Sequence, residues 1–137
     1  MLDRFFMKFN WPKGDKEMTD RDAISSWVEG YIRAWNSNDP ADIGRLFAEN
    51  ALYYTSPFEE PWRGRDNILA GWLERKDEPG TWEFDYDILA VENDIGVIRG
   101  LTHYKEAPPR TYSNIWVTQL NETGECVEFT EFWMKKK

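Results

Sequence analysis

The segment AWNSNDPADIGRLFAENA, residues 34–51, marks the junction between two predicted helices. Before it, apolar residues recur at helical spacing from Ile24 to Trp35, which predicts a helix with one apolar face. The polar run NSND ends that helix, and Asp39 followed by Pro40 is typical of an N-cap and the first residue of a new helix. The sequence therefore predicts two helices separated by a short polar turn.

The sequence on either side of this junction extends the pattern. Thr19 and Asp22 predict a capping box at the start of the first helix, with Asp in place of the usual Glu or Gln. Downstream, the run ALYYTS predicts a short strand. After a further loop, helical spacing of apolar residues predicts a third helix, which carries Ile68, Leu69, Trp72 and Leu73.

In the second half of the chain, residue types alternate in the way that is typical of β-strands. Apolar and acidic residues alternate from Trp82 to Ile88, which predicts a strand with one apolar and one acidic face. Further strands are predicted around residues 95–104, 110–120 and 125–134, separated by turn-forming sequences. Three helices followed by a four-stranded antiparallel meander predict an α+β domain.

The composition narrows the classes of function. The chain has 137 residues, which suits one domain, and its 25 acidic against 17 basic residues argue against a nucleic-acid partner. No apolar run approaches the roughly 20 residues of a membrane span, so we expect a cytoplasmic protein without a membrane partner. One cysteine and one histidine exclude a Cys- or His-rich metal site, and we expect neither metal nor cofactor. Eight Trp, eight Phe and six Tyr suit a large-ring core, and equally a cavity for an apolar ligand.

The order of elements, together with three motifs, resembles the SnoaL-like group of the nuclear transport factor 2-like superfamily. The motifs are the segment quoted first, YYTSPF before WRGRDNI, and the closing GECVEFTEFW. The resemblance covers roughly residues 20–134, so we expect residues 1–19 to be an N-terminal extension and 20–137 the SnoaL-like domain. It implies a cone, in which three helices pack on a strongly curved, mostly antiparallel sheet and the interior is the site.

The resemblance also assigns residues to roles. In the ketosteroid-isomerase-like members, a tyrosine five residues before the Asn of the helix-ending turn polarises the substrate carbonyl, and Tyr31 matches it. The position of the general base holds Ser56, and the position of a second acid holds Trp116. Since one of three positions matches, we do not expect steroid-isomerase chemistry.

The loop SPFEEPWRGR, residues 56–65, is too rigid and apolar for a simple connection. We interpret it as the rim of the cone, with Phe58 and Trp62 covering the mouth and Gly64 permitting the tight entry into the third helix. The alternative is that Trp62 only seals the edge of the core.

Strand alternation selects the inner wall. With Gly124 in the last turn, a short hairpin sets Asn114 opposite Glu131, with Trp116, Phe129 and Trp133 on the same face. An apolar setting raises the pKa of a carboxyl group toward the range of proton exchange. We therefore predict Glu131, Asn114 and Tyr31 as catalytic residues, although a buried structural Glu–Asn pair is an equal alternative. The predicted ligand-binding residues are Trp35, Tyr54, Ser56, Trp62, His103, Trp116, Phe129 and Trp133.

The orientation of His103 and Arg99 is open at this point. Facing inward, His103 could shuttle protons and Arg99 could anchor an anion, whereas facing outward both are surface residues. Apolar residues on the predicted outer face suggest a homodimer formed sheet to sheet, and the family often assembles in this way. They are Ile115, Val117, Phe132 and Met134, with Cys126 beside them.

Two functions fit these observations. The first is an enzyme that acts on a small apolar or aromatic carbonyl compound by cofactor-independent proton transfer, of isomerase, cyclase or dehydratase type. The second is a ligand-binding or dimeric assembly module without catalysis, which the serine at position 56 favours.

Overall fold

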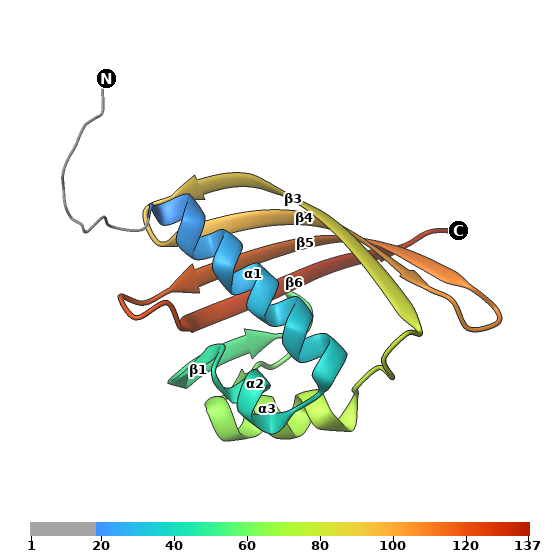
Figure 1. Cartoon of the computed structure of the whole chain (residues 1–137), viewed down its shortest axis with the longest axis horizontal. Helices are drawn as coiled ribbons and strands as arrows, with labels where there is room; N and C mark the ends of the chain where they lie inside the picture. Colours follow the sequence, from blue (N-terminus) through green and yellow to red (C-terminus); the bar gives the residue numbers. More distant parts are fainter. Residues whose placement is uncertain (1–18) are drawn as a thin grey trace.

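The computed structural model describes residues 19–137 of the chain. Within this range it has three helices and six strands, shown in Figure 1. In chain order these are α1 (Asp20–Ser37), α2 (Pro40–Gly44), β1 (Phe47–Tyr54), β2 (Trp62–Arg63), α3 (Arg65–Glu74), β3 (Trp82–Glu92), β4 (Ile95–Tyr104), β5 (Arg110–Leu120) and β6 (Cys126–Lys135).

The strands form one sheet in the order β2-β1-β6-β5-β4-β3. All neighbours are antiparallel except β1 and β6, which run parallel. The long strands curve over α1, while α2 and α3 lie below it beside β1 (Figure 1). The predicted α+β architecture of three helices on a curved, mostly antiparallel sheet is confirmed. The parallel contact of β1 was not predicted.

The helix boundaries follow from the caps in the sequence. Thr19 Oγ1 accepts a hydrogen bond from the Asp22 amide at 3.0 Å, and the Asp22 side chain accepts one from the Thr19 amide. At the other end of α1, Asn38 has a left-handed backbone with φ 51°, a conformation that Asn tolerates well. Asp39 then caps α2 by accepting from the Ala41 amide at 2.8 Å. These contacts confirm both predicted caps.

The register of β5 and β6 differs from the prediction. Trp116 lies opposite Glu131, and Asn114 lies opposite Trp133. The predicted pairing of Asn114 with Glu131 is therefore displaced by two residues, because residues 121–125 form a wider turn and a bulge follows at Gln119/Leu120. A shift of two residues keeps each side chain on its face, so Asn114 and Trp116 are buried as predicted.

The same irregularity moves Cys126 to the inner face. Its side chain is fully buried, and Thr118 Oγ1 donates to its sulfur at 3.3 Å. Burial raises the pKa of the Cys126 thiol to about 12, so the group stays a neutral thiol. The prediction that Cys126 lies on the outer face is wrong, because alternation counted across a bulge loses its phase.

The loop of residues 56–65 also departs from expectation at one position. Phe58 is 99% exposed and covers nothing, whereas Trp62 lies in β2, opposite Tyr53 of β1. Gly64 enters α3 with φ 84°, a backbone that side-chain-bearing residues rarely adopt. Phe58 was misassigned because an apolar residue in a loop carries no information about its direction.

Most of the predicted N-terminal extension, residues 1–18, lies outside the described residues. Within the part that the structure describes, no helix is long and apolar enough to cross a membrane.

Candidate functional site

A cavity of about 330 Å³ lies between the C-terminal half of α1, strand β1, the end of α3 and the inner face of β4–β6. Its volume is at the small end of the range of ligand pockets. Seven of the predicted site residues line it, namely Tyr31, Trp35, Trp62, Asn114, Trp116, Glu131 and Trp133.

Four of the predicted residues do not line this cavity. Tyr54 does not line the cavity, and the adjacent Tyr53 takes its place, because an irregularity in the pairing of β1 with β6 between Phe47 and Leu52 sets the face of the residues that follow. Ser56 lies in the loop beyond the lining residue Thr55. Phe129 is fully buried beneath the wall and packs on other aromatic rings.

The fourth of these residues, His103, lies on the outer face of the sheet. Its inward neighbour Thr102 is buried, and His103 Nδ1 is 2.9 Å from Thr111 Oγ1 on the adjacent strand. Arg99 shares this outer face and contacts Asp87 at 3.4 Å. The outward orientation, one of the two left open by the sequence, is the one observed.

Glu131 ends a chain of three hydrogen-bonded side chains along the inner wall. Thr102 Oγ1 donates to Asn114 Oδ1 at 2.7 Å, and Asn114 Nδ2 donates to Glu131 Oε2 at 2.7 Å. Thr102 fixes the orientation of the Asn114 amide, which therefore presents its NH₂ group to the carboxyl. Burial raises the pKa of Glu131 to about 7, against smaller opposing effects of Trp116 and Asn114. Near neutral pH this carboxyl can both accept and release a proton.

Trp116 contributes a donor without a partner. Its side chain is buried and lines the cavity, yet its Nε1 has no hydrogen-bond partner among the described residues. The indole lies close enough to Glu131 to lower the carboxyl pKa by at least as much as Asn114 does, although the geometry falls short of a hydrogen bond. A buried N–H group of this kind is costly, and an oxygen atom in the cavity would satisfy it.

The wall opposite Glu131 carries a pair of tyrosines. The hydroxyl groups of Tyr31 and Tyr53 lie 2.7 Å apart in the interior. Burial, the largest cause, raises the pKa of both phenols well above the ordinary value, and the charge of Glu131 adds to the effect. Both hydroxyls therefore stay protonated at physiological pH. One of them donates to the other, so the pair has one O–H left to donate a hydrogen bond to a carbonyl or enolate oxygen.

Aromatic rings hold these polar groups in a rigid frame. Tyr31 packs on Trp116 with ring centroids 4.5 Å apart, and Tyr53 stacks on Trp62 at 4.9 Å. Trp35 stacks on Trp82 at 3.8 Å. Such contacts restrict side-chain rotation and present flat apolar surfaces to a ligand.

The mouth of the cavity contains residues that the sequence did not indicate. Asp77 accepts hydrogen bonds from Trp35 Nε1 at 3.0 Å and from the Tyr104 hydroxyl at 3.4 Å. Burial and the charge of Asp77 raise the pKa of Tyr104. Arg75 and Arg110 also line the mouth. These residues lie in loops or at strand ends, where no periodic signal marks them.

No group of three or more His, Cys, Asp or Glu side chains among residues 19–137 could hold a metal ion. The acid–base and hydrogen-bonding groups of the cavity are those of its own side chains, with Glu131 as the acid–base group.

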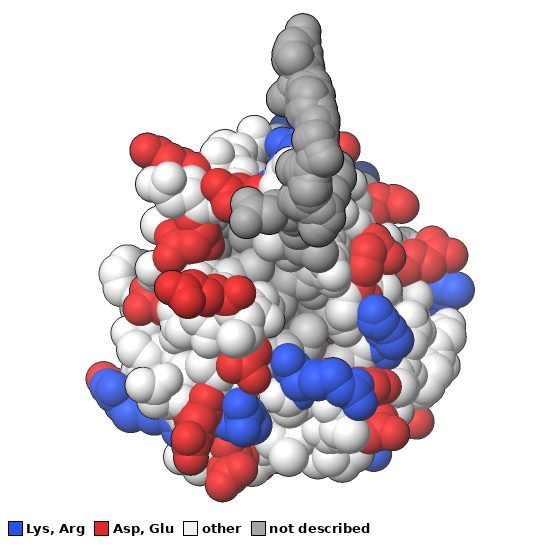
Figure 2. All heavy atoms as spheres, turned by 60° about the vertical axis from the view of Figure 1, so that its left-hand side comes forward, with Lys and Arg blue, Asp and Glu red and all other residues white. Residues whose placement is uncertain are grey.

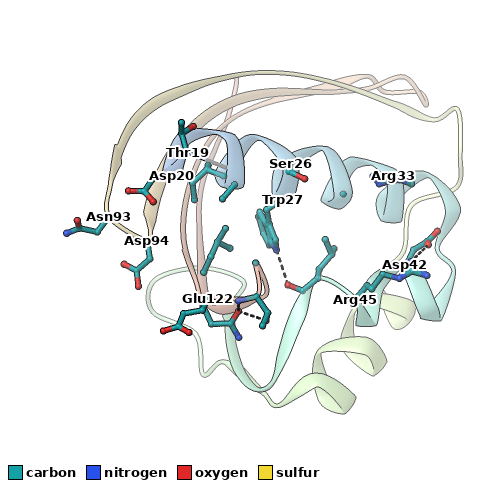
Figure 3. A pocket seen from close by; sticks show the side chains of 18 residues that line it. Thr19, Asp20, Ser26, Trp27, Arg33, Asp42, Arg45, Asn93, Asp94 and Glu122 are labelled. Atoms are coloured by element: carbon teal, nitrogen blue, oxygen red, sulfur yellow. Dashed lines mark hydrogen bonds and ion pairs between the residues drawn. The ribbon is translucent and has the colours of Figure 1, made fainter. Parts of the chain in front are cut away.

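A second and larger hollow, of about 1080 Å³, runs along α1 from Thr19 to Arg33 (Figure 3). It opens at the end of the molecule with the β3–β4 and β5–β6 turns, a face on which acidic side chains outnumber basic ones (Figure 2). Its polar groups are largely satisfied, since Trp27 Nε1 donates to the Leu46 carbonyl at 2.9 Å and Arg45 contacts Asp42 at 3.0 Å. We call this hollow the end groove. We regard the smaller cavity, the central cavity, as the candidate site because several buried polar groups lie together there, and one of them lacks a hydrogen-bond partner among the described residues.

Comparison with known families places this fold and cavity in context. A family model described as SnoaL-like domain matches residues 28–131. The match spans well over half of the chain, which therefore belongs to this family, and the predicted resemblance is confirmed. No significant match was found among curated proteins.

Solved structures are similar in fold at low identity. A putative ketosteroid isomerase from Kribbella flavida is 17% identical with a TM-score of 0.68, over 88% of this chain and 84% of that one. An epoxide hydrolase of M. tuberculosis, described as LEH-like, is 13% identical with a TM-score of 0.62, over 82% of each chain. SalBIII, an epoxide hydrolase/cyclase-like enzyme in pyran ring formation in the polyether salinomycin, is 17% identical with a TM-score of 0.67, over 85% and 95%. At these identities the similarity establishes the fold alone.

Proposed function

We propose that this member of the SnoaL-like family binds a small apolar or aromatic carbonyl compound in the central cavity and catalyses proton transfer beside the carbonyl. The observation that carries the proposal is Glu131, whose half-buried side chain lines the cavity among aromatic rings and accepts a hydrogen bond from Asn114, with a pKa raised to about 7. Groups with such a pKa in a cavity are typical of general acid–base sites. The neutral hydroxyl pair on the opposite wall supports the same reaction.

The proposed step needs only groups of the chain. The Glu131 carboxylate removes a proton from the carbon next to the substrate carbonyl, and the electron pair of the broken C–H bond moves into an enolate. Tyr31, backed by Tyr53 at 2.7 Å, donates a hydrogen bond to the enolate oxygen. Protonated Glu131 then returns the proton to carbon, at the same or at a conjugated position. Asn114 holds the carboxyl in one orientation throughout.

The test uses 2-tetralone, a bicyclic aromatic ketone with acidic protons next to its carbonyl. We expect the wild-type protein to accelerate the exchange of these protons for deuterium in D₂O, followed by NMR. Glu131→Gln should remove about 10²–10⁴-fold of this acceleration, which is the usual contribution of a general base. Glu128→Gln is the matched control, because Glu128 is an exposed carboxylate three positions away on the same strand.

The pH dependence provides a second readout. Since only the carboxylate can accept the proton, the exchange rate above background should rise with pH and level off above about 7. Full exchange activity in Glu131→Gln, or a rate independent of pH between 5 and 8, would contradict the catalytic role.

One observation favours the second candidate, a ligand-binding or assembly module without catalysis. The outer face of the sheet is apolar where β4, β5 and β6 meet, and Leu101, Phe132 and Met134 are 51%, 41% and 73% exposed. With Ile115 and Val117 between them, this face suits a sheet-to-sheet homodimer. Light scattering should give twice the chain mass of 16.3 kDa, and Val117→Lys should give the monomer. A wild-type monomer at micromolar concentration would contradict the dimer.

A further inference from the structure

The mouth of the central cavity is basic, although the chain carries a net charge of −8. Three cationic residues belong to its lining, namely Arg75, Lys76 and Arg110. The acidic members of the lining are Asp77 and Glu131, and Asp77 is engaged by Trp35 and Tyr104. Three cations against two carboxyl groups leave the lining of the cavity with an excess of positive charge.

These three cations have no ion pair among the described residues. Five other basic residues do have acidic partners, in the pairs Arg45–Asp42, Arg63–Glu60, Arg65–Glu125, Arg99–Asp87 and Lys105–Glu83. Cations without an ion pair within residues 19–137 also occur elsewhere, as at Arg33, but at this opening three of them line one cavity.

The two arginines are also held in place by aromatic rings. The guanidinium carbon of Arg75 lies 5.6 Å from the Trp62 ring centroid, and that of Arg110 lies 4.5 Å from the Tyr104 ring centroid. Stacking uses the flat face of a guanidinium and leaves its edge of N–H donors free. Arg110 spends one nitrogen on the Tyr112 hydroxyl at 3.3 Å, and its remaining donors stay available.

The depth of the cavity offers a complementary polar end. The Nε1 of Trp116, which has no partner among residues 19–137, and the Tyr31 hydroxyl lie in the interior among aromatic rings. A neutral carbonyl suits this end, and an anion suits the mouth. The cavity therefore suits a ligand that has a neutral carbonyl at one end and an anionic group at the other.

We propose that the ligand of the cavity is an aromatic or apolar carboxylic acid, whose carboxylate is bound at the mouth by Arg75 and Arg110 while its neutral carbonyl end enters the aromatic interior. This inference rests on the proposed function, which places the ligand in the central cavity, and it adds that the ligand is an anion. Planar guanidinium groups recognise carboxylates through paired N–H donors, which the compact Lys76 ammonium does not offer.

The experiment compares ligands that differ only in charge. Binding of 2-naphthoate, its neutral methyl ester and 2-naphthyl phosphate is measured by titration calorimetry at low and at high salt. We expect 2-naphthoate to bind at least about tenfold more tightly than the ester, with an advantage that shrinks as salt screens the charges. It should also bind more tightly than the phosphate.

Arginine variants test which residues cause the tighter binding of 2-naphthoate. Arg75→Gln and Arg110→Gln should each lower the affinity for 2-naphthoate about tenfold and leave the affinity for the ester within about twofold. The unchanged ester binding shows that the cavity is intact. Arg33→Gln is the matched control, because Arg33 is an exposed arginine of the end groove. Arg110→Lys should restore the advantage only in part.

The outcomes separate the two proposals. Equal binding of the acid and the ester overturns the carboxylate site alone, and tighter binding of the phosphate replaces the carboxylate with a phosphate group. Binding of neither ligand overturns the carboxylate site together with the cavity as a ligand site. Exchange of 2-tetralone retained in Glu131→Gln, with the advantage of 2-naphthoate intact, overturns only the catalytic role.

Discussion

The central cavity and the end groove both border helix α1. The larger of the two hollows has the simpler chemistry. The end groove has about three times the volume of the central cavity, 1080 Å³ against 330 Å³. The central cavity, however, contains a half-buried carboxyl with a raised pKa, a buried hydroxyl pair and an indole N–H that has no partner among residues 19–137. The groove contains exposed charges and satisfied polar groups.

The difference teaches that volume is a weak guide to function. Polar groups on a surface are solvated at little cost, so a large polar groove needs no ligand to explain it. A buried polar group that lacks a partner costs stability, and its retention in a rigid aromatic frame suggests a gain elsewhere. The four predictions below test whether chemistry belongs to the cavity alone.

The largest expected effect is that of Tyr31→Phe on proton exchange. Loss of the donor to the enolate should slow the exchange of 2-tetralone about 100-fold, as removal of one oxyanion donor does in other enzymes. Tyr112→Phe is the control, since its hydroxyl lies at the mouth and accepts from Arg110. Equal rates for the two variants would remove Tyr31 from the mechanism.

The inner wall is also the part of the site that the sequence predicts best. Strand alternation puts Asn114 and Trp116 on one face of their strand, and the predicted hairpin added Glu131 to that face. The predicted register was wrong by two residues, a shift that leaves the face of each side chain unchanged. Helical spacing identified Tyr31 and Trp35 in the same way. Their roles remain predictions, while their position around one cavity is observed.

The remaining features had no periodic signal. The bulge beside Leu120 depends on how the turn closes, and it moved Cys126 inward. Tyr53 and Tyr54 are adjacent tyrosines, and only the pairing of β1 with β6 decides which of them enters the cavity. Arg75 and Arg110 are brought together by tertiary structure across the chain, which alternation cannot reveal.

The second prediction concerns stability and sharpens the comparison between buried and exposed carboxyls. The pKa of Glu131 is about 7 in the folded chain, against an ordinary value of 4.5. Between these values the folded state keeps a proton that the unfolded state releases, so the free energy of unfolding should fall as pH rises from about 4.5 to 7. The contribution is on the order of 2–3 kcal/mol, with allowance for partial exposure.

Urea unfolding at pH 4.5 and pH 8 measures this contribution. Glu131→Gln should lose that part of the pH dependence and gain stability over the wild type at pH 8 more than at pH 4.5. Glu128→Gln should follow the wild type at both values. If the free energy of unfolding changed with pH by the same amount in all three proteins, the Glu131 carboxyl would titrate as a solvated group.

The third prediction alters the lip of the cavity without touching a polar group. A Cβ atom added at Gly71 would overlap the ring of Trp62, which stacks on Tyr53. Gly71→Ala should therefore cost about 1–3 kcal/mol and weaken the binding of methyl 2-naphthoate several-fold. Gly44→Ala is the control, because its Cβ would meet only Arg65 Cδ at 3.8 Å, an ordinary contact. Identical affinities for the two variants would show that Trp62 does not shape the site.

The smallest expected effect is that of Glu122→Gln in the end groove. Glu122 is exposed and lines the groove at the β5–β6 turn (Figure 3), so its charge is solvated and its loss should change the free energy of unfolding by less than about 0.5 kcal/mol. Exchange of 2-tetralone and binding of 2-naphthoate should both stay within about twofold of the wild type, since removal of one distant surface charge is largely screened by salt. A loss of exchange comparable to that of Glu131→Gln would assign the chemistry to the end groove, because Glu122 lines the groove and not the central cavity.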